Sequence, residues 1–220
     1  MVERKFSEDA LFEGRRLACQ RGERLLFQDL DFVLRTGQAL ILEGANGSGK
    51  SSLLRLAAGL ARPAFGGLFW GGAPIGKDAE AHRRRLLYLG HADGLKAGLT
   101  VYENLDFWAR LTGVTTPLDD ALDSFDMAPL ADLPARFLSA GQRRRLALTR
   151  LSLRPAQPPV LWLLDEPTTA LDAAAQATLL ALIRRHLVEG GLAMLASHDP
   201  LPGLDAQRLR IEDDHAEAAV

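Results

Sequence analysis

The sequence predicts an α/β fold with a mainly parallel sheet covered by helices on both faces. Short apolar runs of strand length, at 160–164 and 192–196, alternate with helical patterns such as the one at 173–187. A glycine-rich turn at 44–51 lies between an apolar run and a second helical pattern. The content of 47% hydrophobic and 25% charged residues is that of a globular chain, which excludes a disordered or membrane-spanning class.

The first half of the chain reads as strands around one helix. A β-rich lead-in alternates apolar and polar residues at 16–19 and 28–34, with turns at 21–22 and 36–37. A strand over 39–43, the glycine-rich turn and a helix over 52–60 follow. A short strand and turn at 67–72 and a strand at 85–89 complete this half.

The second half begins with a helical stretch. Apolar residues recur at helical spacing from Val101 to Leu111, and prolines break the shorter helical pieces at 118–125 and 128–135. A helix over 142–151 precedes the buried strand at 160–164. We therefore expect one domain over 1–220, with a helical subdomain inserted at about 92–155.

Charge and composition exclude several classes of function. A net charge of −2 gives no electrostatic case for nucleic acid as a partner. Cys19 is the only cysteine, which excludes an intrachain disulfide and a cysteine-based metal site. Residues 1–16 lack the apolar stretch of a signal peptide, and no uncharged run reaches the ~18–20 residues that cross a bilayer. We expect membrane contact only through a partner.

Residues 44–51 match the phosphate-binding loop G-x-x-x-x-G-K-[ST] in the context it requires, between a strand and a helix. Glycines let backbone N–H groups surround a triphosphate, and the helix N-terminus adds its positive dipole end. Lys50 is expected to reach the β- and γ-phosphates, and the Ser51 hydroxyl to bind Mg²⁺. The residues predicted to bind the nucleoside triphosphate here are Gly44, Asn46, Gly47, Ser48, Gly49, Lys50, Ser51 and Ser52.

An acidic pair follows the apolar strand at 160–164. Parallel-sheet folds place a carboxylate near the Mg²⁺ shell in this way, so Asp165 is the predicted magnesium-associated acid. Glu166 comes next and is predicted to polarise the attacking water as a general base. An exposed strand end with no catalytic role is the alternative interpretation.

The segment 138–142 opens a helix with a serine and a glycine. Backbone N–H groups and the Ser139 hydroxyl at this helix start predict a second anion-binding site, with Gly141 and Gln142 beside it. An ordinary serine-capped helix is the alternative in isolation.

Taken together, these motifs resemble those of the ATP-binding cassette (ABC) ATPases, from about residue 15 to 210. The resemblance rests on the loop at 44–51, the signature at 138–142, the strand and acids at 160–166, a D-loop at 169–172 and the Ser197-His198 pair. It implies a P-loop NTPase fold, with a RecA-like parallel-sheet core, an N-terminal antiparallel β subdomain and an inserted helical subdomain.

The resemblance also implies a mechanism. Two copies of the chain would sandwich two ATP molecules head to tail, with Ser139 and Gly141 of one copy facing the γ-phosphate held by Lys50 of the other. His198 would meet charge on the transferring phosphoryl group. Asp172 would lie across the dimer seam and couple the two sites.

Three positions depart from the family pattern. Ala140 replaces a common glycine of the signature. His91 takes the place of the Q-loop glutamine that contacts Mg²⁺ or the water; a protonated His91 would repel the metal, which predicts pH-sensitive activity. Arg21 stands where an aromatic residue usually stacks on adenine; it either stacks in its place or is solvated.

Segments at 87–105 and 138–145, with Arg21, resemble the ATPase subunits of the cytochrome c maturation (haem export) system. That resemblance implies integral membrane partner subunits at the cytoplasmic face of a bacterial inner membrane, with ATP hydrolysis driving haem export or release of a haem-loaded chaperone. No histidine pairing in the sequence argues for haem binding. An ATPase of another small transporter, such as a lipid or lipoprotein release system, is the alternative. Two further alternatives are a soluble ABC protein and a cassette that binds ATP without hydrolysing it.

Overall fold

The computed structural model describes residues 11–114, 117–155, 157 and 160–212. These residues form two compact units, which are treated separately. The first unit comprises the described residues of 1–88, 159–165 and 185–220, and the second those of 89–158 and 166–184. The prediction of one domain with an insertion over about 92–155 stays a prediction.

An antiparallel sheet opens the first unit, with the strand order β2-β1-β4-β5. Its strands are β1 (Leu11–Arg21), β2 (Arg24–Arg35), β4 (Phe65–Trp70) and β5 (Ala73–Pro74). Buried and exposed residues alternate along the second half of β2, from Leu30 to Arg35, which places one face of that strand in the core. β1 alternates only in part, and its register against β2 shifts at several points. β1 and β2 confirm the predicted β-rich lead-in.

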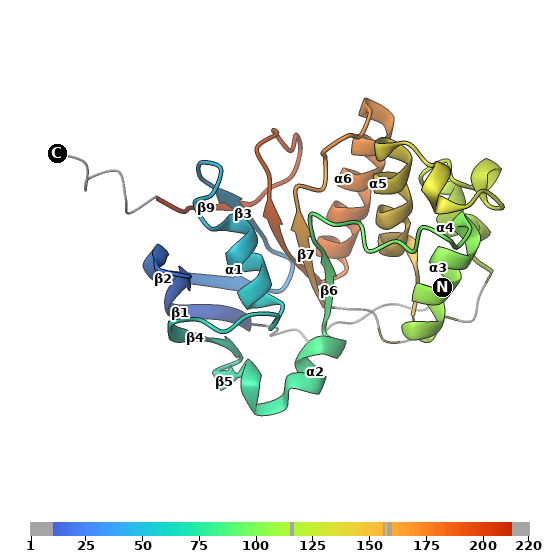
Figure 1. Ribbon diagram of the computed structural model, residues 1–220. Coiled ribbons are helices and arrows are strands. Elements are labelled where there is room, and N and C mark those ends of the chain that lie inside the picture. Colours follow the sequence, from blue (N-terminus) through green and yellow to red (C-terminus); the bar gives the residue numbers. More distant parts are fainter. Residues whose placement is uncertain (1–10, 115–116, 156, 158–159, 213–220) are drawn as a thin grey trace. The chain divides into compact units, whose positions relative to one another are not determined.

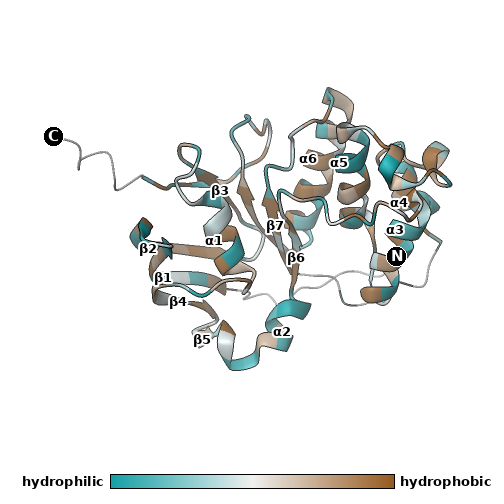
Figure 2. Ribbon diagram, in the orientation of Figure 1, coloured by the Kyte–Doolittle hydropathy of each residue, from teal (hydrophilic) through white to brown (hydrophobic). Residues whose placement is uncertain are grey.

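A second sheet has the strand order β6-β7-β8-β3-β9, and its β7-β8, β8-β3 and β3-β9 pairs are parallel. The strands are β3 (Ala39–Glu43), β6 (Leu86–Leu89), β7 (Leu161–Asp165), β8 (Leu192–Ala196) and β9 (Gln207–Arg210). β7 and β8 are buried along their whole length, and Figure 2 shows β3 and β7 as hydrophobic. Strands buried on both faces are typical of a parallel sheet.

Helix α1 (Lys50–Ala57) packs in one continuous core with both sheets (Figure 1). Leu53, Leu54 and Leu56 are completely buried on α1. The same core contains Phe12 from β1 and Leu42 from β3. This packing fixes the N-terminal end of α1, and with it the loop that precedes the helix.

Short elements complete the first unit. A 3₁₀ turn, η1 (Ile75–Asp78), leads into α2 (Ala79–Arg84), whose first turn is capped by the Asp78 side chain. Arg83, Arg84 and Arg85 are exposed, as is usual for a short run of like charges.

Helices make up the second unit. Its helices are α3 (Val101–Leu111), α4 (Asp119–Asp123), α5 (Ala140–Leu148) and the start of α6 (Ala173–Val188), with 3₁₀ turns η2 (Ala128–Leu130), η3 (Ala135–Phe137) and η4 (Thr149–Ser152). A capping box between Thr100 and Glu103 starts α3. The helical piece predicted over 128–135 is wrong in extent: only the short turns η2 and η3 form, because Pro134 lacks the N–H that would continue a helix.

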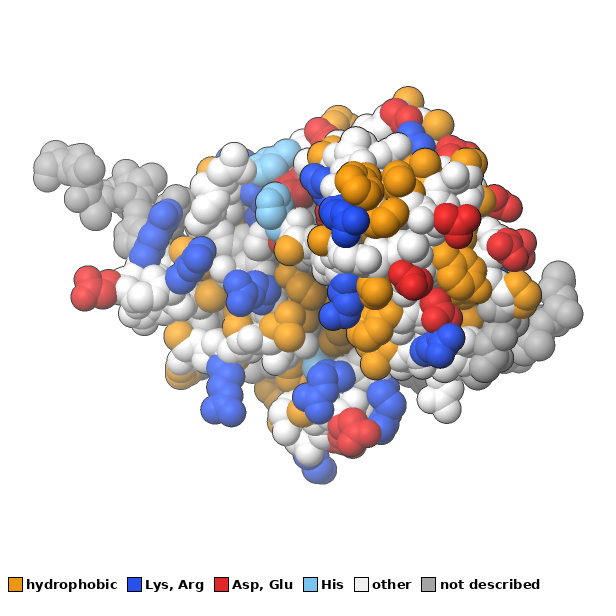
Figure 3. Space-filling view, turned by 45° about the vertical axis from the view of Figure 1, so that its right-hand side comes forward, with side chains coloured by type: hydrophobic (Ala, Val, Ile, Leu, Met, Phe, Trp, Pro, Cys, Tyr) orange, Lys and Arg blue, Asp and Glu red, His pale blue; other side chains and the backbone are white. Residues whose placement is uncertain are grey.

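Among the described residues, no helix is both long and apolar enough to cross a membrane. Figure 3 shows basic, acidic and hydrophobic side chains interspersed on one face of the molecule.

Candidate nucleotide site

The loop at 44–51 joins β3 to α1 in a conformation that requires glycine. Gly44, Gly47 and Gly49 have φ of +146°, +83° and +112°. A Cβ on Gly44 would lie 2.5 Å from the Ile211 carbonyl oxygen and 2.6 Å from Ser48 Oγ. Any side chain at position 44 would therefore collide with the protein itself, and the loop turns through backbone conformations that glycine adopts, as expected of a phosphate cradle.

Lys50 lies inside this loop and is only 7% exposed. Its ammonium donates to the carbonyl oxygens of Gly44 (2.8 Å) and Ala45 (3.0 Å) and lies 3.0 Å from Nε2 of His198. Since an ammonium group only donates, Nε2 of His198 accepts, and the ring proton is on Nδ1. The fold thus brings Lys50 and His198 together, although 148 positions separate them.

Ser51 Oγ donates to Asp165 Oδ1 at 2.9 Å. Asp165 is 2% exposed at the carboxyl end of β7, where parallel sheets bind ligands. A hydroxyl and a carboxylate are the oxygen donors that Mg²⁺ prefers. Within the described ranges, no group of three or more His, Cys, Asp or Glu residues is arranged to hold a metal ion.

The loop also fits a phosphate group. Ser48 Oγ is buried with no hydrogen-bond partner among the described residues. A buried hydroxyl without a partner is costly, and a phosphate oxygen would supply one. Together with the glycine conformations of the loop, this unpartnered hydroxyl supports the predicted role of the loop.

A pocket of about 410 Å³ adjoins the loop. It is lined by residues of β3, β9 and the segment after β8, namely Ile41, Glu43, Gly44, Ser197, His198, Asp199, Pro200, Leu201 and Arg208. Glu43 and Arg208 form an ion pair on its wall. The pocket leaves the exposed His198 ring open to a ligand from one side.

Glu166 follows Asp165 and has a backbone φ of +47°, which residues other than glycine seldom adopt. Its carbonyl oxygen accepts a hydrogen bond from Nη2 of Arg144 at 2.8 Å. A run of like charges such as Arg143–Arg145 is usually solvated, but Arg144 is only 5% exposed. The sequence carries a signal for this: Ala147, Leu148 and Leu151 lie on the same helix face, at spacings of three, four and seven.

The signature segment forms the N-terminus of α5, which begins at Ala140 rather than at the predicted Gln142. The Gln142 N–H donates to Ser139 Oγ (3.2 Å), and the Ser139 N–H donates to Gln142 Oε1 (2.8 Å). This capping box is the ordinary helix start considered above as an alternative. A Cβ on Gly141 would lie 2.8 Å from the Ala170 carbonyl oxygen, so glycine is needed there for packing against the D-loop.

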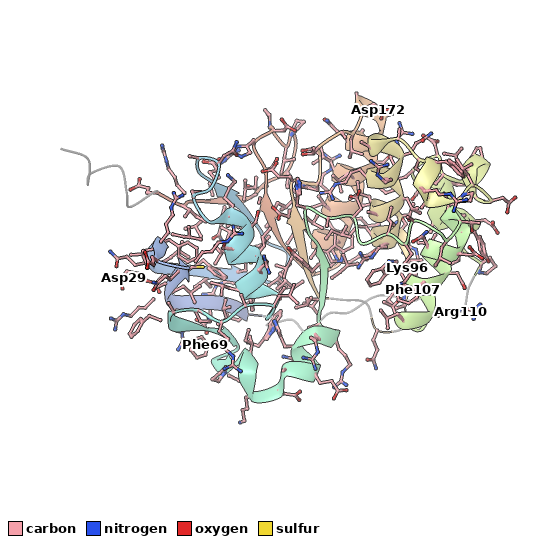
Figure 4. The ribbon with its side chains drawn as sticks, viewed as in Figure 1. Asp29, Phe69, Lys96, Phe107, Arg110 and Asp172 are labelled. Atoms are coloured by element: carbon pink, nitrogen blue, oxygen red, sulfur yellow. The ribbon has the colours of Figure 1, made fainter. Side chains whose placement is uncertain are left out.

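Asp172 lies at the N-terminal end of α6 (Figure 4). Its Oδ1 accepts from the Ala175 N–H at 2.9 Å, and its Oδ2 pairs with Arg145. The carboxylate therefore anchors the D-loop to two helices of its own chain. Its predicted role across a dimer seam stays a prediction.

Two predicted residues remain without a structural test. Arg21 is exposed at the end of β1, where it pairs with Arg24 across the hairpin. Cys19, two residues earlier, contacts Ser52 of α1, and burial raises the pKa of its thiol. His91 is exposed in the segment after β6. Adenine stacking by Arg21 and metal contact by His91 stay predictions.

Comparison with known proteins agrees with this geometry. The ABC transporter family model matches residues 27–169. The cytochrome c biogenesis ATP-binding export protein CcmA of Rhodospirillum rubrum is 53% identical over 88% of this chain and 83% of its own length. CcmA of Haemophilus influenzae is 44% identical over 91% of this chain and 95% of its own.

Two solved structures show the same fold. The ATP-binding subunit of an ABC transporter superposes with a TM-score of 0.75 at 24% identity, over 86% of this chain and 80% of its own. An ABC transporter protein from Pyrococcus furiosus superposes with a TM-score of 0.77 at 24% identity, over 91% and 97%. The predicted ABC ATPase fold is therefore confirmed. The chain belongs to the ABC transporter family, as an ATP-binding, ATP-hydrolysing protein that resembles CcmA.

Proposed function

We propose that the chain is the ATP-hydrolysing subunit of a bacterial membrane complex that acts in cytochrome c biogenesis. The observation that carries this proposal is its 53% identity to an export protein of that name over most of both chains. The segments at 87–105 and 138–145 support it, because the sequence resembles the cytochrome c maturation ATPases there.

Lys50 would bind the β- and γ-phosphates of ATP. Its ammonium now donates to two loop carbonyls, and phosphate oxygens would replace these acceptors with charged ones. The N–H groups around Gly47 and Gly49 and the Ser48 hydroxyl would hold the remaining oxygens. Arg21 is the candidate for stacking on adenine.

Ser51 and Asp165 would hold Mg²⁺, with His91 as a further candidate ligand. The ion, when bound, neutralises charge on the phosphates and orients them for in-line attack. The existing 2.9 Å hydrogen bond between Ser51 and Asp165 keeps both oxygens within reach of one ion. Each oxygen is thus positioned before the substrate arrives.

Glu166 would accept the proton of the attacking water, and His198 would donate to the γ-phosphate. The contact between His198 and Lys50 supports this role, because Lys50 is the proposed ligand of the same phosphate. A second copy of the chain, packed head to tail, would bring Ser139, Gly141 and Gln142 of its own signature helix to the same phosphate. The composite site would need both copies for hydrolysis.

The partners in this proposal are a second copy of the chain and integral membrane subunits, with no nucleic acid. The chain would lie at the cytoplasmic face of a bacterial inner membrane, held there by those subunits. ATP hydrolysis would drive haem export or the release of a haem-loaded chaperone.

Complementation tests this function. In a strain that lacks the chain, the wild-type protein should restore haem-stained c-type cytochromes, whereas Glu166→Gln should bind ATP, co-purify with the membrane subunits and restore none. Normal c-type cytochromes in the deletion strain would refute the proposed process. Restoration by Glu166→Gln would refute the proposed base.

A further inference from the structure

Arg144 joins three segments of the helical unit. From α5, its Nη1 donates to the Gly90 carbonyl oxygen (3.1 Å) and to Asp93 Oδ1 (3.2 Å). Its Nη2 donates to the Glu166 carbonyl oxygen at 2.8 Å. One buried guanidinium thus holds the signature helix, the segment that carries His91 and the residue proposed as the base.

The contact with Glu166 fixes a backbone that is otherwise unfavourable. Glu166 has φ of +47°, and such a conformation persists only where the surroundings determine it. On one side, Asp165 is held by the Ser51 hydroxyl. On the other, the Arg144 hydrogen bond orients the peptide after Glu166. The direction in which the Glu166 side chain points from its Cα therefore depends on the Ser51–Asp165 and the Arg144–Glu166 hydrogen bonds.

We propose that Arg144 is a positioning residue for ATP hydrolysis, which acts by holding the backbone of Glu166. This proposal rests on the proposed role of Glu166 as general base. The neighbouring arginines have different contacts: Arg143 donates to the Leu138 carbonyl, and Arg145 pairs with Asp172. The role therefore belongs to position 144 and not to the arginine run as a whole.

Lysine cannot replace Arg144 in this role. A guanidinium is a rigid planar fork whose two Nη groups here reach acceptors on separate segments, whereas an ammonium is a single point donor. Arg144→Lys keeps the charge opposite Asp93 and releases at least one carbonyl. This makes it a mild variant that tests geometry and not charge.

The test compares Arg144→Lys with Arg84→Lys in the full chain, purified with the membrane subunits that accompany it. Arg84 is exposed on α2 and pairs with Glu80, so it is a matched control outside the site. We expect kcat for ATP to fall about 10- to 100-fold in Arg144→Lys, because displacements near 1 Å cost about that much. KM for ATP and the melting temperature should change little, and Arg84→Lys should match the wild type.

A double-mutant cycle with Glu166→Gln shows whether Arg144 acts through Glu166. Single-turnover phosphate release should fall in Arg144→Lys but show no further fall when Arg144→Lys is added to Glu166→Gln. The same fold loss in both backgrounds would overturn the proposal. A wild-type kcat in Arg144→Lys, measured together with an inactive Glu166→Gln, would also overturn the proposal. A wild-type kcat in Glu166→Gln would instead refute the proposed role of Glu166 as the base.

Asp93→Asn provides a second variant that keeps the arginine and both carbonyl contacts. Its kcat should stay within about 3-fold of the wild type, since the Glu166 contact remains. A loss as large as that of Arg144→Lys would assign the effect to the ion pair and overturn the proposed route.

Discussion

His82 makes the stability of the first unit dependent on pH. The ring is 3% exposed; Trp70 Nε1–H donates to its Nδ1 at 2.9 Å, and its Nε2–H donates to the Ala57 carbonyl at 3.0 Å. Burial lowers the pKa of His82, the Ala57 carbonyl opposes this, and the charges of Arg85 and Arg83 lower the pKa further. The folded protein therefore holds this ring neutral.

The sign of the effect follows from the lowered pKa. As the pH falls through about 6.5, the unfolded chain binds a proton at His82 that the folded chain does not. The contribution of the neutral His82 ring to the free energy of unfolding is therefore fully present above that pH. As the pH falls further, this contribution is lost by at most about 1.4 kcal/mol per pH unit, until the pH reaches the pKa of His82 in the folded protein. Protonation also removes the acceptor of the Trp70 N–H.

Urea unfolding of the wild type and of His82→Gln, at pH 8, 7, 6 and 5, measures this effect. At pH 8 the variant should be less stable by about 1–3 kcal/mol, because the half-buried Trp70 N–H loses its acceptor. The difference should shrink as the pH falls, since only the wild type carries the titrating ring. Both proteins retain every other histidine, so parallel curves would refute the reasoning.

Two further predictions concern activity. Gly141→Ala should lower the rate of ATP hydrolysis about 10-fold or more, because the added Cβ would lie 2.8 Å from the Ala170 carbonyl and shift the D-loop. Gly98→Ala is the control, since no atom lies within 4 Å of the Cβ it would add. Equal rates in the two variants would contradict the proposed effect of Gly141→Ala. His91→Ala should raise the Mg²⁺ concentration that half-saturates ATP hydrolysis, because it removes a proposed ligand of the ion. An Mg²⁺ dependence equal to that of the wild type would contradict the proposed role of His91.

The pattern of apolar residues predicted the strands whose side chains pack in the core. β3, β7 and β8 are short apolar runs that are almost wholly buried, and β2 alternates from Leu30 to Arg35, so each of these strands carries its own signal. β9 was missed because its residues, Gln207–Arg210, are mostly polar and exposed, and the strand forms only by pairing with β3. α2 was missed because six residues give little periodicity, and its capping Asp78 is recognised only with hindsight.

The candidate site shows the same division. The glycines and Lys50 could be predicted because a local motif fixes both their spacing and their conformation. The contacts of Arg144 could not be predicted, because its three acceptors lie on segments 22 to 54 positions away, and their meeting depends on tertiary packing. The Arg145–Asp172 pair is likewise a tertiary contact.

Two consecutive arginines of α5 make contacts with other segments of the same chain. Arg144 holds Glu166, and Arg145 with Gly141 holds the D-loop at Asp172 and Ala170. In the proposed head-to-tail dimer, the N-terminus of this helix serves the nucleotide of the partner. A displacement of α5 by that γ-phosphate would then move the base and the D-loop of its own chain together. Glycine stands at position 141 because any larger residue would place its Cβ 2.8 Å from the Ala170 carbonyl oxygen.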